Sequence, residues 1–204
     1  YICWAAQAAL QHFHGVPKHQ LPEKMFGVFP HRLMTPDAPL LRGLEDDFPV
    51  PVSRHTAVRA DDLPGGGIEI LAASAESGLG LIRDQQNRAV YMFNHLEYDA
   101  DTLSREYFRE LRDGRPVPLP RHYFPDDDPA RCPAQTWRGS ARILFRNWLD
   151  EVWHHRAARK DGRQAMDWLF GAPGPVAVGV CLTDMRLDVE EPLTTVPAVL
   201  RSLA

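Results

Sequence analysis

The sequence lacks any long hydrophobic run and any excess of positive charge over its 204 residues. No apolar stretch approaches the roughly 18–20 residues that a membrane helix needs, so we expect no membrane partner. The formal net charge of −4 offers no global basic surface for nucleic acid. Hydrophobic residues make up 44% and charged residues 25%, which excludes disordered and collagen-like classes and indicates a globular protein.

Cysteine is also scarce. Cys3, Cys132 and Cys181 are odd in number and widely spaced, which predicts neither a disulfide framework nor a zinc site. The sequence shows no secretory pattern, so we expect reduced thiols and a cytoplasmic protein. The adjacent pair His154 and His155 would point about 100° apart on a helix, so we predict no metal site there.

The start of the chain predicts a strand that turns directly into a helix. Tyr1-Ile2-Cys3 has the pattern of a strand end, and helical periodicity follows to Gly15. Such a strand needs parallel neighbours, which often come earlier in a chain. We therefore expect residues 1–159 to be the C-terminal portion of a longer domain. Residues 160–204, with one expected strand at 176–182, are an unassigned extension.

After this first helix, strands are predicted before any further helix. Prolines between residues 17 and 67 predict only short extended pieces and no long helix. An antiparallel meander follows. The extended pieces are expected around 27–29 and 51–54, and the meander strands at 68–72, 80–82 and 89–93.

Two helices are predicted after the meander. The first runs from about Thr102 to Asp113, with Asp101 as its candidate cap and Gly114 at its end. The second runs over about 140–158. Their apolar faces are Leu103, Tyr107, Phe108 and Leu111 for the first, and Leu144, Phe145, Trp148, Leu149 and Val152 for the second.

Cys3 and His95 are the best candidates for chemistry. A turn from strand to helix exposes a side chain at the top of a sheet and aims backbone N–H groups at it, which stabilises a thiolate and a developing oxyanion. His95 follows the third meander strand, and Glu97 lies two residues on. In extended chain these side chains point the same way, so the carboxylate can orient the imidazole. Together they form the arrangement of nucleophilic acyl transfer.

A set of short segments, in order and spacing, resembles one known family. The segments are Ile2 to Leu10, Gly15 to Lys18, Glu23 to Phe29, Leu41 to Gly43, Val52 to His55, Asn94 to Asp99, Tyr123 to Pro125, Asp127 to Pro129 and Asn147 to Leu149. Over about residues 1 to 150 they resemble the homoserine O-acyltransferases, the O-succinyl- and O-acetyltransferases of methionine biosynthesis. The resemblance implies an α/β fold with a flavodoxin-like doubly wound sheet of the class I glutamine amidotransferase type, here expected without its N-terminal half.

The resemblance also implies roles for six residues. Cys3 matches the acyl-thioester nucleophile, His95 the general base and Glu97 its orienting partner. The positions that match substrate-binding residues are Lys24, Ser53 and Arg109. The implied reaction moves an acyl group from acyl-CoA to the hydroxyl of L-homoserine through an acyl-cysteine, with no cofactor beyond the CoA ester and no metal. A homodimer is compatible with it.

Several alternatives stay open. We favour acetyl over succinyl as the acyl group and expect the selecting residue to precede Tyr1. Serine is a second acceptor, since one methylene is worth only about 1–3 kcal/mol of discrimination. The rivals are a glutaminase of the amidotransferase type and a non-enzymatic scaffold. Two departures from the family pattern are Ser140, where we expect histidine, and Ala5, where the amidotransferases carry glycine.

Overall fold

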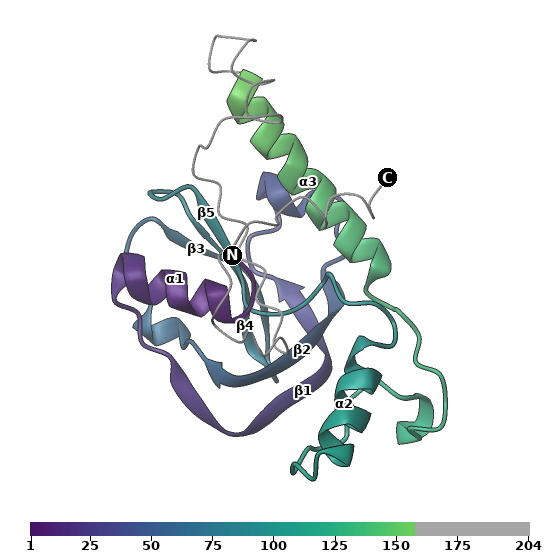
Figure 1. Cartoon of the computed structure of the whole chain (residues 1–204). Coiled ribbons are helices and arrows are strands. Elements are labelled where there is room, and N and C mark those ends of the chain that lie inside the picture. Colours follow the sequence, from purple (N-terminus) through teal and green to yellow (C-terminus); the bar gives the residue numbers. More distant parts are fainter. Residues whose placement is uncertain (158–204) are drawn as a thin grey trace, which may run out of the picture.

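The computed structural model describes the backbone of residues 1–157 and the side chains of residues 1–154. A curled five-stranded antiparallel sheet lies at its centre, in the order β2-β1-β3-β4-β5, with helices on both sides (Figure 1). The expected strand at 176–182 and Cys181 lie outside the described residues. The strands are β1 (His19–Leu33), β2 (Asp47–Ala57), β3 (Ile68–Ser74), β4 (Gly78–Asp84) and β5 (Ala89–Met92).

The helices match the sequence pattern closely. They are α1 (Trp4–His14), α2 (Thr102–Arg112) and α3 (Arg138–Ala157), with short 3-10 turns η1 (Pro39–Leu41), η2 (Ala60–Asp62) and η3 (Pro125–Asp127). Gly15 ends α1 in the left-handed conformation, at φ 68°, as a C-terminal glycine commonly does. The expected helices and the β3-β4-β5 meander are therefore confirmed.

The prediction of only short extended pieces between residues 17 and 67 is wrong. The strands β1 and β2 have 15 and 11 residues and pair with each other over most of their length. Pro49 and Pro51 fit in β2 because it is an edge strand, where a missing N–H on the free side costs no ladder bond. The carbonyl of Pro51 points to the free edge and accepts a hydrogen bond of 2.9 Å from the backbone N–H of His95.

Alternate residues of the strands enter two separate hydrophobic cores. On one face, α1 covers a core with Leu10, Ile82 and Tyr91 at its centre. On the other, α2, α3 and their loops cover a larger core that includes Leu81 and Trp137. Leu81 and Ile82 are neighbours in β4 and point to opposite faces. The sheet therefore lies between α1 on one face and α2 and α3 on the other.

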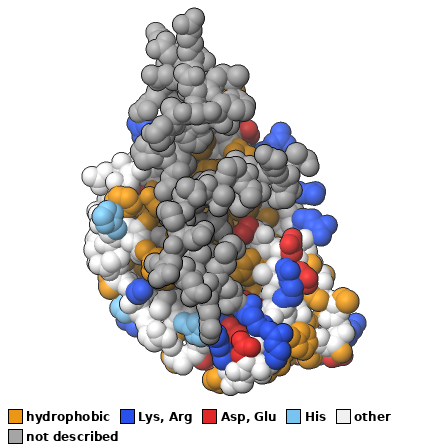
Figure 2. All heavy atoms as spheres, in the orientation of Figure 1, with side chains coloured by type: hydrophobic (Ala, Val, Ile, Leu, Met, Phe, Trp, Pro, Cys, Tyr) orange, Lys and Arg blue, Asp and Glu red, His pale blue; other side chains and the backbone are white. Residues whose placement is uncertain are grey.

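The buried face of α2 differs from the apolar face that its sequence predicts. Leu103 is fully buried, but Phe108 and Leu111 are 47% and 46% exposed, and hydrophobic side chains lie on the surface in the region of α2 (Figure 2). Glu106 and Glu110 are buried instead. The cause is electrostatic, because both carboxylates pair with a buried ammonium from β1, described below.

Candidate active site

Cys3 forms the turn between the strand end and α1. Its backbone has φ 52° and ψ −119°, a conformation that residues with a side chain rarely adopt and that clusters at functional sites. Its N–H donates to the carbonyl of Met92 at 2.7 Å, beside the parallel pairing of Ile2 with Met92. The strand-to-helix turn predicted from the sequence is therefore present, with the geometry of a nucleophile elbow.

The expectation that this turn exposes the sulfur is wrong. Cys3 is only 2% exposed and His95 only 1%. Both His95 and Arg54 interact electrostatically with Cys3. The reacting groups are thus screened from water, which strengthens their mutual electrostatic interaction.

His95 and Glu97 form the predicted pair. Nδ1 of His95 lies 2.6 Å from Oε1 of Glu97, and the imidazole stacks on Tyr98 with ring centroids 4.2 Å apart. Because the proton on Nδ1 points toward the carboxylate, Nε2 is left to exchange a proton with the sulfur. Nε2 is buried and has no hydrogen-bond partner among the described residues.

The surroundings of His95 favour its protonated form. Burial alone lowers the pKa of His95, but interaction with the Cys3 thiol and hydrogen bonding to Glu97 outweigh it and raise the pKa to about 9. At neutral pH the imidazole therefore holds a proton readily and is poised beside the sulfur.

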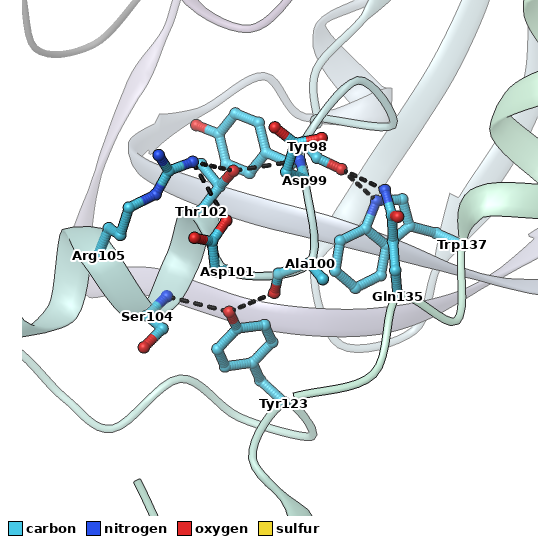
Figure 3. A network of polar contacts seen from close by, with 10 residues as sticks. All are labelled: Tyr98, Asp99, Ala100, Asp101, Thr102, Ser104, Arg105, Tyr123, Gln135 and Trp137. Atoms are coloured by element: carbon cyan, nitrogen blue, oxygen red, sulfur yellow. Dashed lines mark hydrogen bonds and ion pairs between the residues drawn. The ribbon is translucent and has the colours of Figure 1, made fainter. Parts of the chain in front are cut away.

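The loop after His95 is fixed by groups from several parts of the chain (Figure 3). The carbonyl of Tyr98 accepts hydrogen bonds from Gln135 at 2.9 Å and from the indole of Trp137 at 2.8 Å. The hydroxyl of Tyr123 donates to the carbonyl of Ala100 at 2.6 Å. These contacts hold the ring that stacks on His95.

Sequence reasoning missed these supporting residues. Tyr98 and Tyr123 lie in segments that match the family, but periodicity gave no reason to assign them a contact. Trp137 is fully buried, and the signal that could have found it was an isolated tryptophan before a helix. Ser140, where we expected histidine, is partly exposed on α3.

A second buried cluster lies between β1, β2 and α2. Nζ of Lys24 is 2.7 Å from Oε1 of Glu106 and 2.6 Å from Oε1 of Glu110. The hydroxyl of Ser53 donates to the same oxygen of Glu106 at 2.6 Å. Two of the predicted substrate-binding residues, Lys24 and Ser53, are thus brought together. The two glutamates were not predicted, because their buried positions depend on the ammonium of Lys24.

Arg109 lies on α2 between the two glutamates in sequence and is half-buried. The second cluster and the surroundings of Cys3 share one strand, β2, in which Ser53 precedes Arg54. Among the described residues, no hydrogen bond joins Lys24 or Ser53 directly to Cys3 or His95.

No described residues form a metal site. Within the part of the chain that the structure describes, no group of three histidine, cysteine, aspartate or glutamate side chains could hold a metal ion. Nε2 of His14 lies 2.5 Å from Oδ2 of Asp84. No helix in the described range is both long and apolar enough to cross a bilayer.

Comparison with known families decides the relationship. The sequence profile of one family, described as homoserine O-succinyltransferase, matches residues 1–158. The chain belongs to the homoserine O-succinyltransferase family. The resemblance seen in the sequence is therefore confirmed.

Curated members of this family share about half of the matched residues with the chain. The homoserine O-acetyltransferase of Rhizorhabdus wittichii is 56% identical over 153 residues, 74% of this chain and 47% of that protein. The homoserine O-acetyltransferase of Synechococcus sp. is 54% identical over 151 residues, 74% of this chain and 50% of that protein. The chain spans about half the length of the curated relatives it matches.

Solved structures confirm the fold class of this family member. A glutamine amidotransferase from Thermotoga maritima has a TM-score of 0.51 at 17% identity, covering 74% of this chain and 60% of that one. A GMP synthase-like protein from Thermoplasma acidophilum has a TM-score of 0.52 at 16% identity, covering 78% of this chain and 59% of that one. The α/β fold of the class I glutamine amidotransferase type is thus shown.

Proposed function

We propose that this protein transfers an acyl group from acyl-CoA to the hydroxyl of L-homoserine, through an acyl-cysteine, in methionine biosynthesis. The observation that carries the proposal is the strained turn at Cys3 beside the buried pair of His95 and Glu97, in a chain of this family. We place the reaction in the cytoplasm, where the thiol stays reduced.

The first half-reaction loads the cysteine. His95 accepts the proton of the Cys3 thiol at Nε2, and the thiolate attacks the carbonyl carbon of acyl-CoA. We assign the stabilisation of the resulting oxyanion to the backbone N–H of Trp4, the first residue of α1. The bond from the carbonyl carbon to the CoA sulfur then breaks, His95 returns the proton to that sulfur, and CoA leaves.

The second half-reaction releases the product. His95 removes the proton from the homoserine hydroxyl, whose oxygen attacks the acyl carbon on Cys3. The bond from the acyl carbon to Sγ breaks, and the proton moves from His95 to the cysteine. The product is the O-acyl ester, and the enzyme returns to its starting state.

We assign acceptor binding to the second buried cluster. One ammonium, on Lys24, faces two carboxylates, on Glu106 and Glu110, which leaves one surplus negative charge. A surplus of this sign suits the α-ammonium of an amino acid. Arg109 supplies a guanidinium whose forked donors suit its α-carboxylate. Ser53 completes the polar lining.

Acetyl is the acyl group that we favour. The curated relatives with high identity are acetyltransferases, whereas the family profile carries the name of the succinyltransferases. A glutaminase is the second candidate, because the similar solved structures include an amidotransferase. Turnover of the intact protein with acetyl-CoA or succinyl-CoA plus homoserine, and ammonia release from glutamine, distinguish the three.

The substitution Cys3→Ser tests the mechanism. We expect it to abolish acyl-enzyme formation from labelled acyl-CoA, because a hydroxyl is a far weaker nucleophile than a thiolate at neutral pH. Intact-protein mass spectrometry measures the acyl adduct. Cys132→Ser is the matched control, since Cys132 is exposed, and it should load normally. Full turnover in the Cys3→Ser variant would exclude an acyl-cysteine.

A further inference from the structure

Arg54 is a buried cation without a counter-ion among the described residues. Its side chain is 6% exposed and donates from NH1 to the carbonyl of Thr56 at 3.1 Å and from NH2 to the carbonyl of Ser77. Its Nε is buried without a hydrogen-bond partner, and within the described part of the chain no carboxylate pairs with it. Burying an unpaired charge is costly, so its retention calls for a function.

Hydrogen bonds place this guanidinium beside the first turn of α1. The carbonyl of Thr56, which accepts from Arg54, also accepts from Nε2 of Gln7 at 3.4 Å, and the Thr56 hydroxyl donates to Oε1 of Gln7 at 2.7 Å. Gln7 lies one helical turn after Cys3, and its N–H donates to the carbonyl of Cys3 at 3.2 Å. Gln7 therefore links the backbone of Cys3 to β2, because its side chain is bonded to Thr56.

The charge of Arg54 interacts with Cys3. Burial lowers the pKa of Arg54 to about 10, and negative charge on Cys3 acts in the opposite direction. Because Coulomb interaction is mutual, the guanidinium attracts negative charge on the sulfur. Another titratable neighbour of Arg54 is His31, which is neutral, since burial lowers its pKa to about 4 and the charge of Arg54 adds to that effect.

The groups that face Cys3 divide into two kinds. From the loop after β5 come His95 and Glu97, which exchange the proton and fix the ring. From β2 comes Arg54, whose hydrogen bonds go to backbone carbonyls. The loop therefore supplies a titrating partner, and β2 supplies a fixed charge.

We propose that Arg54 is a positioning residue for the Cys3 chemistry, a fixed buried positive charge that stabilises the thiolate and the anionic intermediate formed on it. Its bonds to the Thr56 and Ser77 carbonyls hold it in place, so it need not touch substrate. This inference rests on the proposed function and deepens it, but it concerns the sulfur alone, so it holds for any acyl donor.

The test is the alkylation of Cys3 in the intact protein, which needs neither acyl-CoA nor homoserine. Iodoacetamide incorporation at the Cys3 peptide is followed by mass spectrometry across a pH series. We expect Arg54→Met to slow the reaction at pH 7 roughly tenfold and to move the midpoint of the alkylation profile to higher pH. Arg54→Lys, which keeps the charge, should restore most of the rate.

Two further variants separate charge from structure. Arg54→Gln retains a donor to the backbone carbonyls without the charge. It should show the same slower alkylation that we expect of Arg54→Met, and it replaces that variant if the Met variant unfolds. Arg32→Met is the control, because Arg32 is an exposed partner of Asp47 on the same sheet, and it should leave the profile unchanged. A wild-type profile in a folded Arg54→Gln variant would show that Arg54 only ties β2 to the turn at Ser77. If the wild-type protein shows no acyl transfer while its Cys3 is alkylated normally, the result would contradict the proposed function and not the role of Arg54.

Discussion

His95 shows how much of this site depends on single contacts. Burial of the imidazole opposes its charge, yet the thiol on one side and a carboxylate 2.6 Å away on the other raise its pKa to about 9. A raised pKa stabilises the folded state below the unfolded pKa of about 6.5, and this stabilisation is lost as pH rises through about 9. The interactions that favour the protonated imidazole therefore make the stability of the folded state sensitive to alkaline pH.

The substitution Glu97→Gln should expose this dependence. Removing the carboxylate charge leaves burial less opposed, so we expect the pKa of His95 to fall below about 9. Titration of the imidazole ring by NMR measures it directly. The loss of stability between pH 6.5 and 9 should become shallower in unfolding experiments. Glu45→Gln, at an exposed position, is the control, and an unchanged His95 titration in the Glu97→Gln variant would contradict the assigned pairing.

At the scale of elements, close backbone approaches fix where β1 lies. Gly27 has φ +145°, and a Cβ built there would lie 2.2 Å from the carbonyl oxygen of Arg121. The backbone of Arg121 bridges to β1 on either side of this glycine, through Phe26 and Val28. This contact joins the segment before η3 to the strand that carries Lys24. The glycine therefore positions part of the second buried cluster.

Gly27→Ala should destabilise the protein. The added methyl group meets backbone atoms that cannot rotate away, and φ is unfavourable for a side chain, so we expect a loss of about 1–3 kcal/mol. Urea denaturation measures it as a lowered midpoint with an unchanged slope. Gly65→Ala is the matched control, because a Cβ there has open space. Equal midpoints for the two variants would mean that the approach of Arg121 is not needed for stability.

At the scale of the whole molecule, one buried carboxylate joins the end of α1 to the turn between β4 and β5. Asp84, fully buried at the end of β4, lies 2.5 Å from Nε2 of His14 and accepts hydrogen bonds from Asn87 and Tyr91. Burial raises the pKa of Asp84, but the bonds from Asn87 and the charge and hydrogen bond of His14 outweigh it and hold the pKa at about 2. The network closes the core beneath α1.

Acid unfolding should test the contribution of Asp84 and its partners to stability. Because the folded pKa of Asp84 lies below its unfolded value of 3.8, its stabilisation is present above about pH 4 and lost as pH falls toward 2. Asp84→Asn should cost about 1–3 kcal/mol at neutral pH and flatten this part of the profile. Unfolding measured from pH 2 to 7 tests both effects. Asp37→Asn, at an exposed position, should change neither, and retention of the wild-type acid profile by the Asp84→Asn variant would refute the role of Asp84.

Local patterns were enough to predict the elements that carry Cys3 and His95. The turn at Cys3, the meander, both later helices and the spacing from His95 to Glu97 all follow from propensity and periodicity over a few residues. The family resemblance, now confirmed, rests on the same short segments. The length of β1 and β2 was not predictable in this way, because the prolines of β2 are tolerated at the edge of the sheet, and the order of strands is not visible in a local pattern.

Only the tertiary structure decided which charges are buried and with what partners. Lys24 lies 82 residues from Glu106, and Arg54 is far in sequence from both Cys3 and Ser77. A periodic pattern marks apolar faces, but a buried charge is stable only where folding brings an opposite charge or a set of carbonyls to it. The sequence therefore determined which residues are the candidates for nucleophile and base and their order along the chain, whereas the fold determined the electrostatic surroundings of those residues.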